Sequence, residues 1–270
     1  MAPYPASHPC KLCEQPTHIR HTIRDIPYYY CTHCNFLFNT YWDNKPALTP
    51  EQIIANRTRR DERWPAGEAD HMYEKGWETL EYMEWPLAWK SRKIHTILKN
   101  IPLYTSLVRN SIKNKCRNVL DFGCGHGVTA TELRTRDNLD VIGLDPFSPV
   151  EKPYIIRTLL NEHRFDNETF DAIFSIETLE HIPNILETFQ ELGRILKPGG
   201  VLLVQTRRLE DPDYQANKDA WFYLEDPTTH ISIYSEDAMR TIAEKTAWGT
   251  VDFRGVRYAR FVKHQRAISL

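Results

Sequence analysis

The sequence has 270 residues, enough for one α/β domain of ordinary size and a small additional module. Its 34 basic and 36 acidic residues give a formal net charge of −2, so no overall basic field favours nucleic acid or an anionic membrane as a partner. The first residues lack the basic and then apolar pattern of a secretion signal, and no apolar run approaches the roughly 20 residues that cross a bilayer. We therefore expect a cytoplasmic protein with no membrane partner.

Four of the six cysteines form two Cys-x-x-Cys pairs separated by 17 residues: Cys10, Cys13, Cys31 and Cys34. This spacing is typical of a zinc ribbon, in which each turn donates two thiolates to a tetrahedral ion. Four protein ligands leave no open coordination position, so the predicted zinc is structural. Any of four nearby histidines could replace a cysteine, but the cysteine set is complete without them: His8, His18, His21 and His33. The two remaining cysteines, Cys116 and Cys124, are expected to be unpaired thiols.

A domain boundary is predicted near residue 45, where Asn44-Lys45-Pro46 follows a half-buried strand at 35–38. We expect a zinc-ribbon-like module over residues 1–45, a helical cap or linker over 46–115, and a core over 116–270. The middle segment is rich in aromatic residues, and packing of the cap on the core is the simplest explanation for most of them.

The core begins with a short apolar strand that runs into a glycine-rich turn. Gly123, Gly125 and Gly127 follow the strand at alternate positions, and a helix is predicted over Val128–Arg136. Glycines leave the backbone open to a closely bound ligand, and the start of the helix offers unpaired N–H groups. A dinucleotide-binding turn has a third glycine where this chain has Val128, so the spacing argues against a dehydrogenase.

This turn resembles the first motif of class I S-adenosylmethionine-dependent methyltransferases, in which an acidic residue closes the strand and Gly-x-Gly-x-Gly follows. Asp121 and the three glycines match the motif position for position. The resemblance implies S-adenosylmethionine as cofactor and a Rossmann-like α/β sheet with helices on both faces. It also implies that residues of the turn hold the amino-acid part of the cofactor: Asp121, Phe122, Gly123, Cys124, Gly125 and Gly127.

A second apolar strand, 141–145, ends in a carboxylate 18 residues after Gly127. Asp145 can there accept hydrogen bonds from both vicinal hydroxyls of a ribose, as an adenosine-bearing cofactor requires. The alternative role for Asp145 is to cap the following turn at Pro146. A third strand is predicted over 154–160, but the acidic residue that usually follows it in the family is missing, so no adenine contact is assigned.

The resemblance continues as far as Thr206. Phe170-Asp171 opens a predicted fourth strand, and Leu179-Glu180-His181-Ile182 closes the turn after it. The family pattern places Ser175, Ile176 and Glu177 against the methionine half of the cofactor and makes His181 a structural residue at a helix entry. A helix over 183–196 is expected to stop at Lys197-Pro198-Gly199-Gly200, before a fifth strand at 201–204.

Residues 221–235 resemble a signature of a subgroup of bacterial methyltransferases and supply the catalytic candidates. His230 has an ordinary pKa suited to accepting a proton, and Asp226 or Tyr234 would orient its ring. The alternative is a loop held by local Asp and Thr hydrogen bonds. Ser235 is expected to cap a helix, and 251–262 to form a hairpin that turns at Gly255. The resemblance also makes several aromatic residues candidates for the lining of the methyl-transfer chamber: Tyr73, Trp77, Tyr223 and Tyr234.

We expect a methyltransferase that acts on oxygen, carbon, nitrogen or sulfur of a small-molecule metabolite. The first alternative is an RNA methyltransferase, because a bacterial ribosomal-RNA guanine methyltransferase family also places a short zinc ribbon before its core. The neutral charge and the C-terminal third argue against it. The second alternative is a non-catalytic zinc-ribbon adaptor that binds S-adenosylmethionine.

Overall fold

The computed structural model describes residues 4–43, 45, 49, 51–53, 55, 117–136 and 138–264. The predicted helical cap, with Tyr73 and Trp77, and also Cys116 lie outside these residues. The chain divides into two compact units. Residues 1–46 and 175–270 form the first unit, and residues 47–174 form the second unit.

The second unit contains the parallel strands and the glycine-rich turn. Strands β4 (Asn118–Phe122), β5 (Asp140–Leu144) and β6 (Ile155–Ile156) pair in this order and run parallel. Strand β7 (Phe170–Ile176) lies on the other side of β4. The Asp171 carboxylate accepts the backbone N–H groups of Arg117 and Asn118, each at 2.9 Å, and so ties β7 to the start of β4.

Helix α5 spans Val128–Arg136, as predicted, and packs on β5. The apolar side chains of β4 and β5 are buried except for the half-buried Ile142, which is the pattern of parallel strands covered on both faces. The glycine-rich turn therefore leaves a buried strand at one end and enters a helix at the other.

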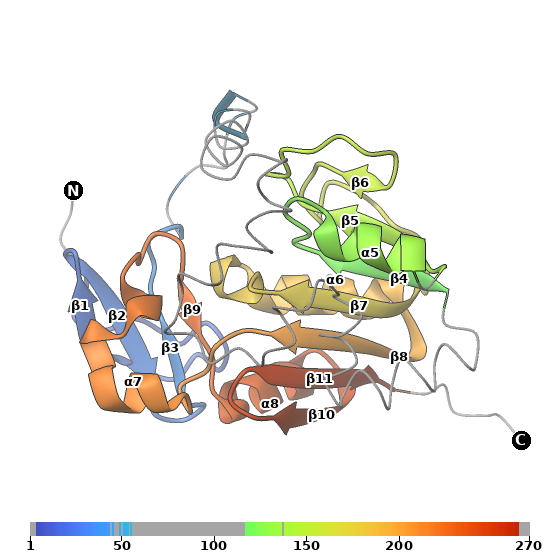
Figure 1. The fold of residues 1–270 in the computed structure, drawn as a ribbon. Helices are drawn as coiled ribbons and strands as arrows, with labels where there is room; N and C mark the ends of the chain where they lie inside the picture. Colours follow the sequence, from blue (N-terminus) through green and yellow to red (C-terminus); the bar gives the residue numbers. More distant parts are fainter. Residues whose placement is uncertain are drawn as a thin grey trace, which may run out of the picture. The chain divides into compact units, whose positions relative to one another are not determined.

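In the first unit, the N-terminal strands share a sheet with a strand from far along the chain. Strands β1 (His18–Ile23), β2 (Ile26–Cys31) and β3 (Phe36–Phe38) form an antiparallel meander, and β9 (Ser232–Ile233) pairs with β3 (Figure 1). Arg24 and Asp25 have φ values of +48° and +65°, so the β1–β2 hairpin turns through left-handed residues. Buried side chains from both parts of the chain join in one core cluster: Tyr28, Leu37, Leu209, Tyr214, Trp221, Tyr223, Leu224 and Ile233.

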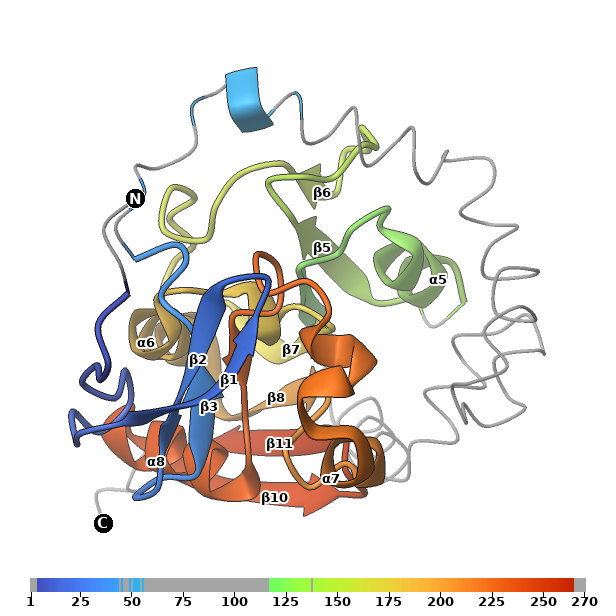
Figure 2. The same ribbon diagram turned by 90° about the vertical axis from the view of Figure 1, so that its left-hand side faces the viewer.

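The rest of the first unit is built on three antiparallel strands. Strand β11 (Tyr258–Lys263) lies between β8 (Leu196–Gln205) and β10 (Trp248–Arg254). Helices α6 (Ile185–Ile195) and α8 (Glu236–Lys245) pack beside these strands (Figure 2). Phe189 of α6 contacts the rings of Trp248 and Phe261. The shorter elements are helix α7 (Pro212–Asn217) and the 3₁₀ turns η3 (Leu179–His181), η4 (Lys218–Ala220) and η5 (Phe222–Leu224).

Parallel strands next to a helix in one unit and antiparallel strands next to helices in the other confirm the predicted α/β class. Ser235 caps α8, where its hydroxyl accepts the Ala238 N–H at 3.0 Å. The C-terminal hairpin also forms as predicted, and Gly255 in its turn has a φ of +52°.

Two predicted element boundaries are wrong. The helix predicted over 183–196 is α6 (Ile185–Ile195). It ends one residue earlier than predicted because Leu196 is already extended (φ −84°, ψ 140°), and β8 begins at Leu196 instead of after Gly200. The third strand has only two residues, because the Glu162 carboxylate accepts the Thr158 hydroxyl at 2.6 Å and the Leu159 N–H at 3.3 Å, which starts a turn. None of the helices in the described part of the chain has the length and apolar character needed to cross a bilayer.

Candidate functional site

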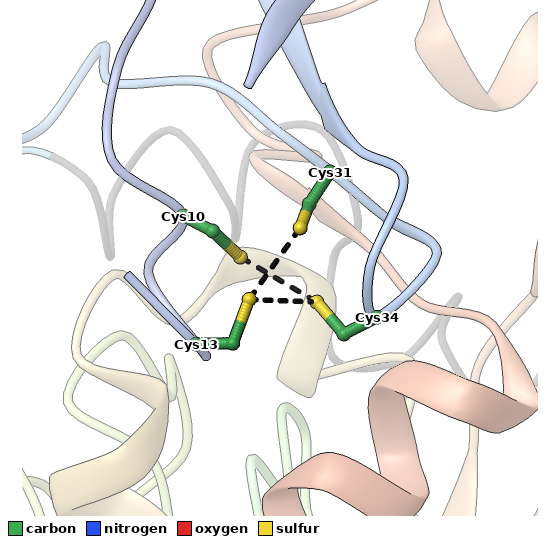
Figure 3. Close-up of side chains that lie close together, drawn as sticks. All are labelled: Cys10, Cys13, Cys31 and Cys34. Atoms are coloured by element: carbon green, nitrogen blue, oxygen red, sulfur yellow. Dashed lines mark hydrogen bonds between the residues drawn. The ribbon is translucent and has the colours of Figure 1, made fainter. Parts of the chain in front are cut away.

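The four cysteines of the N-terminal module converge on one point (Figure 3). The Sγ atom of Cys34 lies 3.5 Å from that of Cys10 and 3.7 Å from that of Cys13, and the Cys13 and Cys31 sulfurs are 3.5 Å apart. Four sulfurs bound tetrahedrally about 2.3 Å from a zinc ion are about 3.8 Å apart. The hydrogen bond between the two thiols lowers the pKa of Cys10 to about 5 and raises the pKa of Cys34, so in the cluster without an ion the Cys10 thiolate is held by the Cys34 thiol. The cluster therefore has the spacing and the chemistry of a tetrahedral metal site.

The cysteine module also holds the segment 226–235, which we call the His230 loop. Cys34 contributes through its backbone carbonyl, which accepts the Ser235 hydroxyl at 3.4 Å. Side chains of the module donate to three backbone carbonyls of the loop: Tyr28 to His230 at 2.6 Å, Asn39 to Pro227 at 2.8 Å and Trp42 to Thr228 at 2.8 Å. The module thus fixes the position of the loop that carries the main catalytic candidate.

In the second unit, the glycine-rich turn has the backbone that its sequence predicts. Gly123, Gly125 and Gly127 have φ values of +78°, +54° and +68°, a region that residues with a Cβ atom rarely adopt. A Cβ on Gly127 would lie 2.7 Å from the side chain of Ile155, whereas one on Gly125 would have nothing within 4 Å. Glycine at 127 is therefore favoured by its left-handed backbone, and a Cβ there would also displace the end of the Ile155 side chain. Gly125 leaves its backbone accessible to a ligand.

Asp145 follows β5 and is bound to the glycine-rich turn. Its Oδ2 accepts the Gly125 N–H at 2.9 Å, and its Oδ1 accepts the Phe147 N–H at 2.7 Å. The second bond is the turn-capping contact considered as the alternative to ribose binding. Each carboxylate oxygen can accept more than one hydrogen bond, so both roles are chemically compatible.

Asp121 lies at the start of the same turn and is 3% exposed. Its Oδ2 atom has no hydrogen-bond partner within the part of the chain that the structure describes. Burial, with a further contribution from the charge of Asp145, raises the pKa of Asp121 to about 7, although a backbone hydrogen bond from Ala130 opposes this. A buried acceptor atom left open in this way suits a cationic donor.

The other residues predicted to contact the cofactor occupy the ends of strands. Phe122 is 7% exposed at the end of β4, and Cys124 follows it in the turn with its sulfur beside Gly143. Ser175 is fully buried near the end of β7, and its hydroxyl has no partner among the described residues. Ile176 is partly exposed and ends the strand.

Glu177 follows β7 in the first unit and has a strained backbone. Its φ is +46°, and its N–H donates to the Gln205 carbonyl at 2.8 Å. Left-handed conformations of residues with a Cβ cost of the order of 1 kcal/mol or more and are often associated with functional sites.

A second carboxyl lies beside Glu177. The hydroxyl of Tyr223 lies 3.0 Å from Glu177 Oε2 and 2.7 Å from Glu180 Oε1, and Glu180 is fully buried. Thr206 donates to the other oxygen of Glu180 at 2.9 Å. The hydroxyl of Tyr223 has only one proton for two carboxyls. Burial and the charge of Glu180 raise the pKa of Glu177 to about 8, so this group of acids favours a bound proton or cation.

Two histidines lie beside the buried carboxyls. The His230 ring stacks on Tyr223 with 4.0 Å between centroids, and His181 lies 4.9 Å from His230. His230 Nδ1 is 2.6 Å from the Tyr223 carbonyl, and His181 Nδ1 is 2.8 Å from the Thr229 carbonyl. A carbonyl can only accept, so both Nδ1 atoms carry the proton. The Nε2 atom of neutral His230 therefore carries a lone pair.

The structure does not place Tyr234 or Asp226 as hydrogen-bond partners of the His230 ring. The Tyr234 hydroxyl donates to the Leu179 carbonyl at 2.9 Å, and its ring stacks on Phe36. Asp226 accepts the backbone N–H and the hydroxyl of Thr228 at 3.0 and 2.6 Å. These are the local Asp and Thr contacts that were weighed as the alternative for this loop.

Glu180 and Thr206 were not among the candidates from the sequence. The available signal was the group Glu177-x-x-Glu180-His181, which places two carboxyls and an imidazole within five residues just after β7. His181 was assigned a structural role, yet its Nε2 atom lies 3.8 Å from Glu180 Oε1.

Comparison with known proteins identifies the family. Residues 90–249 match the model of a family described as a methyltransferase domain, which is more than half of the chain. The chain belongs to this methyltransferase family. The match confirms the predicted class I S-adenosylmethionine-dependent methyltransferase domain and its Rossmann-like fold.

Curated relatives of this methyltransferase are similar over part of their length. Sterol 24-C-methyltransferase erg6 of Aspergillus fumigatus is 29% identical over 187 residues, which cover 60% of this chain and 46% of the relative. Ubiquinone biosynthesis O-methyltransferase of Aliivibrio fischeri is 29% identical over 145 residues, covering 49% of this chain and 61% of the relative. The matched part of this chain thus spans about half of these relatives.

A similar solved structure is the 1,6-didemethyltoxoflavin-N1-methyltransferase of Burkholderia thailandensis. It is 14% identical, has a TM-score of 0.48, and the match covers 92% of this chain and 99% of that chain.

Proposed function

We propose that this protein transfers a methyl group from S-adenosylmethionine to a small-molecule acceptor. The observation that carries the proposal is the buried Asp121 carboxylate, whose Oδ2 atom has no partner among the described residues at the start of the glycine-rich turn. The α-ammonium group of the cofactor has the charge and the donors to satisfy this atom.

Other residues of the turn fit the rest of the cofactor. The space beside Gly125 leaves room for a ligand against the backbone, and the carboxylate of the cofactor is suited to N–H groups at the start of α5. We assign Asp145 to the ribose hydroxyls, through the second acceptor position of each carboxylate oxygen. Bound in this way, the cofactor supplies an electrophilic methyl group on a sulfonium.

The class of acceptor is supported by the relatives and by charge. The names of the two curated relatives refer to a sterol and to ubiquinone biosynthesis, and both activities are methylations. A formal net charge of −2 gives no general attraction for RNA phosphates. We therefore propose a metabolite as the acceptor and leave the choice among oxygen, carbon, nitrogen and sulfur to experiment.

We assign a structural zinc ion to Cys10, Cys13, Cys31 and Cys34. Four thiolates fill the coordination sphere of the ion, so this site supplies folding energy and no chemistry. The hydrogen bonds from the module to the His230 loop extend its stabilising effect to that loop.

His230 is a weak candidate for a general base. Burial, with the neighbouring His181, lowers the pKa of His230 to about 4, whereas an efficient general base has a pKa near the working pH. The ring is neutral, and its Nδ1 proton is fixed by a carbonyl. Such a ring is better suited to offering the Nε2 lone pair to a ligand than to taking up a proton during the reaction.

A transfer assay tests the proposal. The zinc-loaded protein is incubated with methyl-labelled S-adenosylmethionine and either a pool of small phenols, amines and thiols or ribosomal RNA. Label in the small-molecule fraction is the expected result. Label in RNA alone would support the RNA methyltransferase instead, and cofactor binding without any transfer would favour the adaptor.

A further inference from the structure

We propose that Glu180, His181 and His230 bind a divalent transition-metal ion, at a site separate from the four-cysteine cluster. One ligand atom from each residue, a carboxylate oxygen or an imidazole nitrogen, lies within 4.8 Å of the other two. Such atoms bind these ions at about 2.0–2.2 Å, so small side-chain rotations would bring all three into contact with one ion. Two histidines and one carboxylate are a ligand set that binds divalent iron and related ions with positions left open.

The surroundings of the two histidines are those of metal ligands. Each ring donates its Nδ1 proton to a backbone carbonyl. His181 donates to Thr229 and His230 donates to Tyr223. In metal sites this second hydrogen bond fixes the tautomer and directs the other nitrogen to the ion. The two rings lie 4.9 Å apart with 31° between their planes, and one ligand nitrogen of each ring lies within 4.8 Å of the other.

The third ligand, the Glu180 carboxylate, is held by contacts of its own. Glu180 is fully buried, Thr206 donates to its Oε2 at 2.9 Å, and its Oε1 lies 3.8 Å from His181 Nε2. A buried carboxylate beside a second carboxyl, Glu177, needs positive charge nearby to be stable in its ionised form. An ion at Oε1 would provide this charge.

The local structure holds the three ligands in place before any ion binds. Glu180 and His181 are adjacent in η3, and His230 is stacked on Tyr223 at 4.0 Å while Tyr28 binds its backbone carbonyl at 2.6 Å. Rigid placement of this kind lowers the entropy cost of binding.

The chemistry of such an ion deepens the proposed function and rests on it. An ion with three protein ligands keeps open positions, where it binds hydroxyl oxygens and lowers their pKa. Among the possible acceptors, we therefore expect a hydroxyl compound.

Manganese(II) is the probe for this site, because it prefers nitrogen and oxygen ligands to the thiolates of the cysteine cluster. Zinc-loaded protein is titrated with manganese(II), and the free ion is followed by electron paramagnetic resonance. We expect one bound ion per chain and at least a tenfold loss of affinity in His230→Gln and in His181→Gln. His181 has an exposed side chain, so its substitution should leave the fold intact. His18→Gln, on exposed β1, is the matched control and should bind manganese as the unaltered protein does.

Absence of bound manganese, or binding that both ligand variants retain, would overturn the proposal. Calorimetry with S-adenosylmethionine on the same samples separates this outcome from a failure of the proposed function, because none of the three metal ligands is among the residues assigned to the cofactor. A protein that binds the cofactor but no manganese contradicts only the metal site.

Discussion

The glycine-rich turn differs from the cluster of Glu180, His181 and His230 in how its residues are brought together. The turn and Asp145 lie within 25 consecutive residues, Asp121 to Asp145, and neighbouring parallel strands place them side by side. The cluster draws on η3, on Thr206 after β8, on Tyr223 and on the His230 loop. That loop is held by a module more than 180 residues earlier in the sequence. A site built from one segment can be recognised from its spacing, whereas a site built from four segments requires the fold.

The largest effect expected in this comparison comes from Cys10→Ser. Loss of one thiolate should release the zinc, because structural zinc sites contribute folding free energy directly, about 10 kcal/mol or more in small zinc-binding peptides. Zinc analysis and hydrogen exchange should show loss of the metal and faster exchange in the His230 loop. His33→Ala replaces an exposed neighbouring histidine and should retain one zinc per chain. Retention of zinc by the Cys10 variant would contradict the assignment of this ligand.

The next largest effect is expected for Asp145→Ala in the second unit. The substitution removes the acceptor of Gly125 and Phe147 and both proposed ribose contacts. Each hydrogen bond to a charged group contributes about 1.5–3 kcal/mol, so the affinity for S-adenosylmethionine should fall by about 100-fold or more. Calorimetry measures this loss, with the exposed Asp166→Ala as control. Unchanged affinity would contradict the ribose assignment.

A smaller, pH-dependent effect is expected from Asp121. Because its pKa is raised to about 7, the carboxyl becomes protonated below that pH and cannot pair as an anion with the cofactor's ammonium group. The affinity for S-adenosylmethionine should therefore fall as pH decreases through 7, by up to about tenfold per unit, and Asp121→Asn should abolish this dependence. An identical pH profile in the variant would contradict the role of Asp121.

The raised pKa of Asp121 also affects the stability of the cofactor-free protein, which should fall, not rise, as pH increases. The folded state binds the Asp121 proton more tightly than the unfolded state, whose carboxyl has a pKa of about 4. This contribution to the unfolding free energy is complete below about pH 4 and is lost as pH rises through 7. Denaturation of wild type and Asp121→Asn between these pH values measures the difference, and equal pH slopes would contradict it.

The smallest effect is expected for Tyr223→Phe, which removes the hydroxyl shared by Glu177 and Glu180. The ring and its stacking on His230 remain, so the expected loss is about 1–3 kcal/mol of unfolding free energy, the usual cost of an unsatisfied buried polar group. Chemical denaturation measures it. A variant as stable as the parent would show that the carboxyls find other donors.

The sequence predicted the elements that depend on local chemistry. Helix α5 has its predicted bounds, the Ser235 cap forms, and the four cysteines meet at one point. The third strand was overestimated because an apolar run contains no signal for the turn that Glu162 starts. The pairing of β9 with β3, and with it the support of the His230 loop, joins residues almost 200 positions apart, and no local pattern indicates such a contact.

For the candidate site, the same distinction applies to single residues. His230 was predicted as a catalytic candidate, but the hydrogen-bond partner of its ring is the backbone carbonyl of Tyr223. A backbone partner cannot be read from the identity of any side chain. Glu180 was recognised only as part of a family pattern, because its burial depends on Thr206 and Tyr223 from later segments.

The most direct test of the account is calorimetric titration of the purified, zinc-loaded protein with S-adenosylmethionine and S-adenosylhomocysteine, with NAD as control. We predict binding of both sulfur ligands at one site and no binding of NAD, with weaker binding of both ligands in Asp121→Asn. Binding of NAD, or no binding of either sulfur ligand, would contradict the assignment of the glycine-rich turn to this cofactor.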